Sequence, residues 1–150
     1  MLKNRIEKDF KSAFTKKERD KDQVDALRLI KSTIQQKERE GSLHELTDAQ
    51  IIKLLRELSK QKEDTANMYL SAGKQDFANK ELKEKSVIDK YLPALLEEDQ
   101  LRVIIDNIIR MNGYSTIRDM KPIMATLADQ YPGQYDDKSI GSLVKSLLGL

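Results

Sequence analysis

Apolar residues recur every three or four positions along most of the chain, which is the spacing of amphipathic helices. Thr47 followed by Gln50 has the pattern of a capping box at a helix start. No segment shows the period-two alternation that is typical of strands. We therefore expect an all-α fold. Before residue 93 the predicted helices span residues 2–17, 20–41 with Asp20 or Asp22 as cap, 47–73 and 76–92, with a loop over 42–46.

Three shorter helices are expected after residue 93. The first spans 98–111 and ends at Gly113, a common helix stop. The next one starts at Ser115, at Thr116 or near Asp119, where Pro122 falls in its early turns, and the last is capped by Asp136 or Asp137. Among the side chains expected to be buried are Phe77, Leu82, Ile88 and Leu92 in the fourth helix and Ile117 in the sixth.

The density of charge changes near Pro93. Residues 1–92 hold 21 basic and 17 acidic residues, whereas residues 93–150 hold six and eight. Proline disfavours helix at the residue before it, so Leu92-Pro93 marks a boundary. We expect an N-terminal bundle of about four helices over residues 1–92 and a compact three-helix C-terminal lobe over residues 93–150.

Composition excludes several classes of function. The chain has no cysteine and one histidine, His44, so it offers no thiol nucleophile and no multi-histidine metal site. No apolar run is long enough to span a membrane, and the charged N-terminal segment is unlike a signal peptide. The formal net charge of +2 is too small for indiscriminate nucleic-acid binding. We expect a cytoplasmic protein without cofactor, metal, membrane or DNA partner.

A series of short motifs resembles the YqeY family, the free-standing form of the tail domain of the B subunit of tRNA-dependent amidotransferases. These motifs, in chain order, are Leu27-Arg28, Thr47-Asp48, residues 72–77, Glu84, residues 91–93, Asp119-Met120 with Met124, and Gly133 with Asp136, Lys138 and Val144. The resemblance covers nearly the whole chain. It implies a helical bundle joined to a three-helix lobe, tRNA as the ligand held at its elbow, and a tRNA-charging or amidotransferase component as a further partner.

Three positions depart from the family pattern. Glu97 replaces a Ser or Thr and is a poorer N-cap, which puts the start of the fifth helix in doubt. Lys121-Pro122 moves a basic residue by one place. Asp137 replaces a glycine and adds a second acid beside Asp136, which would weaken the approach of an RNA phosphate.

The residues argue against an enzyme, although the family resemblance could attach a carbon–nitrogen ligase label with glutamine as amido donor. Glutamine hydrolysis needs an activated Ser or Cys beside a positioned base, and the chain has no Gly-x-Ser-x-Gly turn and no second histidine. No Gly-x-x-x-x-Gly-Lys loop is present to hold phosphates for activation. We predict no catalytic residue.

Basic stripes are the features with functional promise. Phosphate contacts require solvent-facing cations, and such contacts position RNA without reading its bases. The residues considered are Lys138, Lys145 and Lys121, Ser139 with a backbone N–H near a helix start, Ser142 between the two lysines, Tyr135 as a stacking ring beside Tyr114 and Tyr131, and Lys53 with Lys60. The alternative for Lys53 and Lys60 is a salt-bridged surface, because Glu57 and Asp64 alternate with them along the helix. The alternative for the tyrosines is that they pack in a small core.

Two functions compete at this stage. The first is a non-catalytic tRNA-binding accessory module that recognises the shape of the tRNA elbow. The second is a protein–protein interaction module that has no RNA ligand, which the near-neutral net charge favours.

Limited proteolysis checks the boundary. Because a charge change and a proline stop coincide at Leu92-Pro93, we expect a first cut within residues 93–97 or in the loop at 41–46, identified by mass spectrometry. One uncut core with strand signal in far-ultraviolet circular dichroism would contradict the expected organisation.

Overall fold

The computed structural model describes residues 1–41 and 44–150, and helices are the only regular elements in these residues. The expectation of an all-α fold is confirmed there. The elements are α1 (Leu2–Thr15), α2 (Lys21–Glu40), α3 (Asp48–Ser71), α4 (Gln75–Asp89), α5 (Glu98–Asn112), the 3₁₀ turn η1 (Ile117–Asp119), α6 (Met120–Gln130) and α7 (Asp137–Leu147). Of the loop expected over 42–46, residues 42 and 43 lie outside the described residues.

Local capping explains where these helices begin and end. The carboxylate of Asp20 accepts the backbone N–H groups of Asp22 and Gln23, which fixes the start of α2. Thr47 and Gln50 form the expected capping box at the start of α3. Gly113 ends α5 with a φ of 68°, a left-handed conformation that glycine adopts without the clash of a Cβ atom.

The predicted start of the fifth helix at Glu98 is confirmed, although the residue before it, Glu97, is a poor N-cap type. The fifth helix begins directly after it, because the side chain of Gln100 accepts the backbone N–H of Glu97 at 2.9 Å. The N3 residue supplies the reciprocal bond of a capping box, so a poor N-cap type does not move the helix start.

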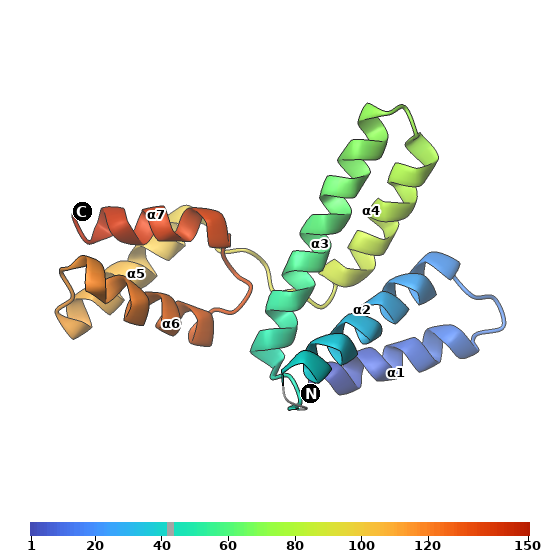
Figure 1. The fold of residues 1–150 in the computed structure, drawn as a ribbon, viewed down its shortest axis with the longest axis horizontal. Helices are drawn as coiled ribbons and strands as arrows, with labels where there is room; N and C mark the ends of the chain where they lie inside the picture. The colour runs from blue at the N-terminus through green and yellow to red at the C-terminus, as the bar shows by residue number, and fades with distance from the viewer. Residues whose placement is uncertain (42–43) are drawn as a thin grey trace. The chain divides into compact units, whose positions relative to one another are not determined.

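The chain divides into two compact units, Met1–Leu92 and Pro93–Leu150, and we describe each unit by itself. In the first unit, α1 and α2 form one antiparallel hairpin and α3 and α4 form a second, which crosses the first (Figure 1). The four helices are therefore two crossed hairpins, and the expected four-helix bundle is not confirmed.

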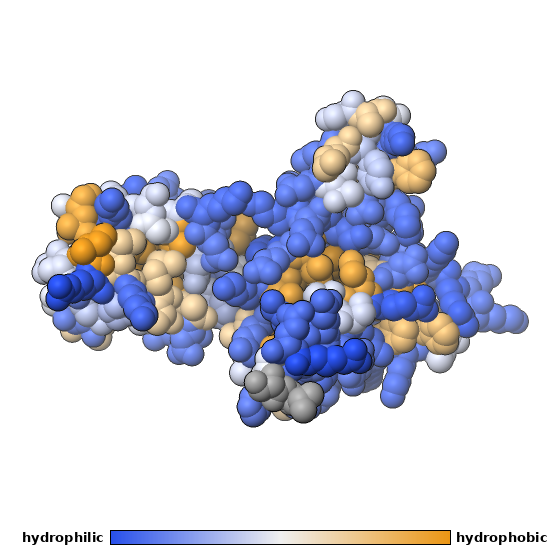
Figure 2. All heavy atoms as spheres, in the orientation of Figure 1, coloured by the Kyte–Doolittle hydropathy of each residue, from blue (hydrophilic) through white to orange (hydrophobic). Residues whose placement is uncertain are grey.

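The core of the first unit lies where the two hairpins meet. Its fully buried side chains come from α1, from the middle of α2, from the first half of α3 and from the last turn of α4; they are Ile6, Leu27, Ile30, Ile51, Leu55 and Ile88. The far half of the α3–α4 hairpin contributes nothing to this cluster. Phe77 is 56% exposed and Leu82 is also exposed, so the expectation that both are buried is wrong. Apolar spheres mark the tip of this hairpin in Figure 2.

The second unit packs α5, α6 and α7 around its own core. The fully buried side chains are Ile105, Ile123, Leu127, Ile140 and Val144. The α-helical part of the sixth element starts at Met120, after the 3₁₀ turn, which agrees with a start near Asp119. Ile117 lies in that turn and is exposed, so its predicted burial is wrong.

Two glycines of the second unit give a matched test of this fold. Gly113 adopts a φ of +68°, whereas Gly141 lies inside α7, and an added methyl group meets no atom within 4 Å at either site. We expect Gly113→Ala to destabilise the unit by about 1 kcal/mol through backbone strain. Gly141→Ala should stabilise it by about 0.5–1 kcal/mol, because alanine loses less backbone entropy in a helix.

Native-state hydrogen exchange of the α5 and α7 amides measures both changes within the full chain. Two shifts of the same sign would contradict the conformations assigned to these glycines.

Candidate nucleic-acid interface

Lys138, Ser142 and Lys145 lie on the exposed outer face of α7. They are placed opposite Ile140 and Val144, which enter the core. Seven residues separate the two lysines, a rise of about 10 Å along the helix axis. The structure thus brings these three predicted residues onto one solvent-facing stripe.

The N-terminus of α7 is already satisfied by its own cap. The carboxylate of Asp136 accepts the backbone N–H of Lys138 at 3.0 Å, and its carbonyl oxygen accepts the N–H of Ser139 at 3.2 Å. Asp137 adds a second carboxylate in the first turn. The N–H of Ser139 is therefore engaged, and the expectation that it would be offered to a phosphate is wrong.

Tyr135 is a further correction. Only 8% of this residue is exposed, and it packs in the core with Leu127 and Ile140. Burial, with the nearby Asp137 carboxylate second, raises the pKa of its phenol. A ring in this position cannot stack on an RNA base. Tyr114 and Tyr131 are half-buried against the same core, as the alternative interpretation of these rings proposed.

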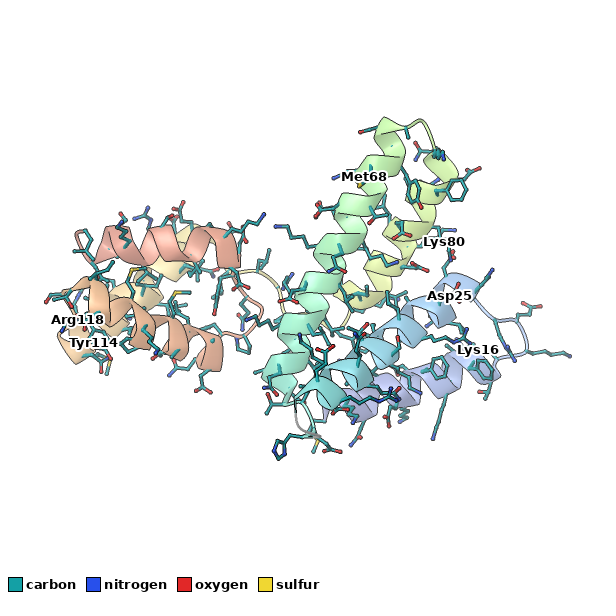
Figure 3. The ribbon with its side chains drawn as sticks, viewed as in Figure 1. Lys16, Asp25, Met68, Lys80, Tyr114 and Arg118 are labelled. Carbon is teal, nitrogen blue, oxygen red and sulfur yellow. The ribbon has the colours of Figure 1, made fainter. Side chains whose placement is uncertain are left out.

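Lys121 lies exposed in the first turn of α6, three residues after Arg118 in η1. Arg118 is also exposed, and it is labelled in Figure 3. Sequence reasoning missed Arg118 because it looked for lysines at helical spacing, and this arginine precedes the α-helix. The one available signal was its position next to Asp119 in the motif that resembles the family.

Asp119 fixes the turn that carries Arg118. Its carboxylate accepts the backbone N–H groups of Ser115 at 2.7 Å and Thr116 at 2.8 Å. These bonds, that of Thr116 first, lower the pKa of the Asp119 carboxyl below its ordinary value of 3.8.

Charge is segregated between the two ends of the second unit. The antiparallel connections place the end of α5, the start of α6 and the end of α7 together (Figure 1). We call this region the basic end; it carries Arg110, Arg118, Lys121 and Lys145, with Asp106 and Asp119 as its acids. At the opposite, acidic end the backbone N–H of Leu96 donates to the carbonyl of Gln134 at 2.8 Å, which joins the start of α5 to the turn before α7. That end carries Arg102 and Lys138 with Glu97, Glu98, Asp99, Asp129, Asp136 and Asp137.

Within the second unit, the basic end holds most of the cations without ion-pair partners. Residues 93–150 are all described, and in them Arg102 pairs with Glu98 and Arg110 pairs with Asp106, both within α5. Arg118, Lys121 and Lys145 take part in no ion pair in this unit, and neither does Lys138 at the acidic end. The structure separates Lys138 from Lys121, although the sequence analysis grouped them.

Lys53 and Lys60 belong to the first unit, where both are exposed on α3. Glu57 and Asp64 are exposed on the same helix, but none of these four residues forms an ion pair within the described part of the chain. The stripe is therefore a mixed-charge surface without fixed pairs.

A second charged cluster lies in the first unit. Its acidic and basic side chains pair with one another. Glu84 of α4 is buried, and its two carboxylate oxygens contact Lys62 Nζ at 2.6 Å and Lys80 Nζ at 3.2 Å. Lys80 also reaches Asp22 at 3.2 Å and Asp25 at 3.1 Å on α2, the helix beside it in Figure 3. We call this set the Glu84 network.

Hydrogen bonding raises the pKa of both lysines in the Glu84 network. The bond to Asp25, followed by those to Asp22 and Glu84, raises the pKa of Lys80. Burial alone would lower the pKa of Lys62, but its hydrogen bonds to Glu84 and Glu81 raise it overall. Each acid here is held by an ammonium group, so the cluster offers no free general base.

The described residues hold neither a metal-ligand cluster nor a membrane-spanning helix. In residues 1–41 and 44–150, no three acidic or histidine side chains are grouped so that they could hold a metal ion. Across the same residues, none of the helices has the length and hydropathy of a membrane span. His44 is exposed.

Comparison with known families decides the relationship. A family described as "Yqey-like protein" matches residues 3–148. The chain belongs to the YqeY family. The family identification made from the motifs is thereby confirmed, while a comparison with curated proteins gives no match.

The motif residues of the YqeY resemblance have structural roles in the first unit. Gly73 has a φ of 73° in the turn between α3 and α4. Glu84 is the centre of the network described above. Tyr91 donates its hydroxyl proton to Asp9 at 2.5 Å, and so ties the end of α4 to α1.

Acid titration tests the role of Asp119. Because its folded-state pKa is depressed, the stabilisation is present above pH 3.8 and is lost as the pH falls through the lower, folded value. We expect the amide shifts of Ser115 and Thr116, followed by NMR, to titrate with a midpoint below 3.8. In Asp119→Asn this transition should vanish. A carboxyl midpoint at or above 3.8 would contradict the hydrogen bonds assigned to Asp119.

Proposed function

We propose that this chain is a non-catalytic accessory module that binds tRNA through the basic end of its second unit. The observation that carries the proposal is the gathering of three cations without ion-pair partners, Arg118, Lys121 and Lys145, where three helix ends meet. Tyr114 at the same end adds a half-buried ring. The motifs of this chain resemble those of the YqeY family, the free-standing form of the tail domain of the B subunit of tRNA-dependent amidotransferases. This resemblance suggests tRNA as the RNA ligand.

Contacts of this kind recognise shape. Exposed cations at one end of a protein contact backbone phosphates, which fixes register without reading bases. The guanidinium of Arg118 can bind one phosphate through two parallel hydrogen bonds, whereas Lys121 and Lys145 act as point charges. The acidic end would repel a second stretch of backbone. A bent RNA that touches a single end of the unit fits this distribution better than a long duplex.

A double charge reversal tests the proposal. Lys121→Glu with Lys145→Glu should abolish most binding of total tRNA in filter-binding titrations, because both cations become repulsive. With so few contacts, the parent should show a log–log salt slope of about −2 to −4, and the variant should flatten it by about two.

Two matched variants separate this site from net charge. Lys53→Glu with Lys60→Glu changes the net charge of the chain equally but alters α3 of the first unit, and it should reduce binding much less. Lys138→Glu, at the acidic end, should also have a smaller effect than Lys145→Glu. Equal losses in the two double variants, or in Lys138→Glu and Lys145→Glu, would contradict the basic end. Equal binding of tRNA and a plain RNA duplex would contradict elbow recognition.

The apolar tip of the α3–α4 hairpin favours protein–protein interaction as a second candidate function. Met68 is 72% exposed and Phe77 is 56% exposed, and the ring of Phe77 stacks on Tyr69 with centroids 5.4 Å apart. Side chains of this size are usually buried. No tRNA binding at low salt, together with capture of a tRNA-charging or amidotransferase component that Phe77→Ser abolishes, would favour this function.

A further inference from the structure

A cationic hollow lies on the first unit, apart from every residue used above for RNA binding. It has a volume of about 240 Å³. Its polar lining is Arg5, Asp9, Ser12 and Lys16 from α1 and the residue after it, Gln23 from α2, and Lys90 with Tyr91 from the end of α4. Figure 3 shows Lys16 at the end of α1.

The spacing along α1 explains why these side chains converge. Arg5, Asp9, Ser12 and Lys16 follow one another at four, three and four residues, which places them on one face of the helix. That face lies beside the apolar stripe of Ile6 and Ala13. It therefore borders the core and faces the end of α4.

Two of the lining groups are fixed by contacts with Tyr91. The guanidinium of Arg5 lies over the Tyr91 ring, with its central carbon 5.0 Å from the ring centroid. The hydroxyl of Tyr91 donates to Asp9 Oδ2 at 2.5 Å, so the acid of the hollow already has a partner. Burial and this hydrogen bond raise the pKa of Tyr91, which keeps the phenol a proton donor to Asp9.

The lining carries an excess of positive charge. Arg5, Lys16 and Lys90 face one carboxylate, and none of the three cations forms an ion pair in residues 1–41 and 44–150. Other exposed cations of the chain also lack ion-pair partners among the described residues, but here three of them line one hollow, whereas the lysines inside α4 are paired within their helix or across to α2. Ser12 and Gln23 add uncharged donors.

We propose that this hollow binds a dianionic phosphate group, either inorganic phosphate or the terminal phosphate of a small monoester. Its volume suits one phosphate group with a small substituent, and it is below the usual range for larger ligands. A phosphate monoester carries close to two negative charges at pH 7 and has three oxygen acceptors. Three cations opposed by one carboxylate match this charge, and the donors of Arg5, Lys16 and Lys90 match the oxygens.

Helix dipoles account for only part of the arrangement. Lys16 and Lys90 follow the last residues of α1 and α4, where a cation complements the negative end of the helix. That effect acts on each lysine separately. It requires neither that both line one hollow nor that Arg5, Ser12 and Gln23 join them.

An NMR titration of the full chain with inorganic phosphate, at constant ionic strength in chloride, tests the site directly. We expect saturable shifts of the amides of Ser12, Lys16, Gln23 and Tyr91. Lys16→Gln with Lys90→Gln should weaken binding about ten-fold or more through the loss of two charge-assisted contacts. Lys11→Gln removes an exposed lysine from another face of α1 and should change the affinity less than two-fold.

Competition then separates the sources of phosphate. Phosphoserine should displace inorganic phosphate, whereas a short RNA without terminal phosphates should not do so at the same phosphate concentration. Shifts that do not saturate, or equal weakening in the Lys11→Gln control, would overturn the site. Displacement by the RNA would overturn the assignment to a dianion. None of these outcomes depends on the basic end of the second unit, so this proposal and tRNA binding fail independently.

Discussion

The carboxylate of Glu84 lies where three helices meet, and the placement of the α3–α4 hairpin depends on its charge being compensated. Lys62 of α3 binds one of its oxygens and Lys80 binds the other, while Lys80 continues to Asp22 and Asp25 of α2. Removing one partner of a buried ion pair leaves an uncompensated charge, which typically costs about 3–5 kcal/mol. The far half of the hairpin, beyond Ser59 on α3 and before Val87 on α4, contributes no side chain to the main cluster. The contacts that join it to α2 include the ionic bonds of Lys80 with Asp22 and Asp25.

The same dependence on charge explains the composition of the chain. Narrow apolar stripes bury one side of each helix and leave a wide polar surface, so 35% of all residues are charged. Where helices pack, as at Lys3 and Glu38 or at Lys62 and Glu84, these charges pair across elements. Other cations stay without ion-pair partners among the described residues, both inside helices, as at Lys53 and Lys60, and at helix ends, as at Lys16, Lys90 and Lys145. The two candidate binding surfaces lie where such cations from several helix ends come together.

Local sequence signals were enough to predict the helices, but they could not predict how the helices pack against one another. Capping at Asp20, Thr47 and Gly113 was predicted because each rule involves a few neighbouring residues. Phe77 was assigned to the wrong environment, and the choice between a stacking and a core position for Tyr135 stayed open, because burial depends on what another helix places opposite a side chain. The spacing of Lys80 and Glu84 is that of an ion pair one helical turn apart, which the sequence shows. The pairs between Lys62 of α3 and Glu84, and between Lys80 and Asp22 of α2, depend on how the two hairpins cross and could not be predicted from the sequence. The candidate RNA residues were mostly placed on the surface as expected, yet their division between two ends follows from the antiparallel connections.

This division changes how net charge should be weighed. The second unit carries six basic and eight acidic residues, a balance that by itself disfavours a polyanion as partner. A ligand, however, contacts one end of the unit and does not experience its net charge as a whole. Charges more than about 8–10 Å away are largely screened at physiological salt. Lys138 and Lys145 are seven positions apart on α7, and that length of helix spans about this distance. The six acids of the acidic end therefore act weakly on an anion at the basic end, and near-neutral composition is compatible with a locally cationic surface.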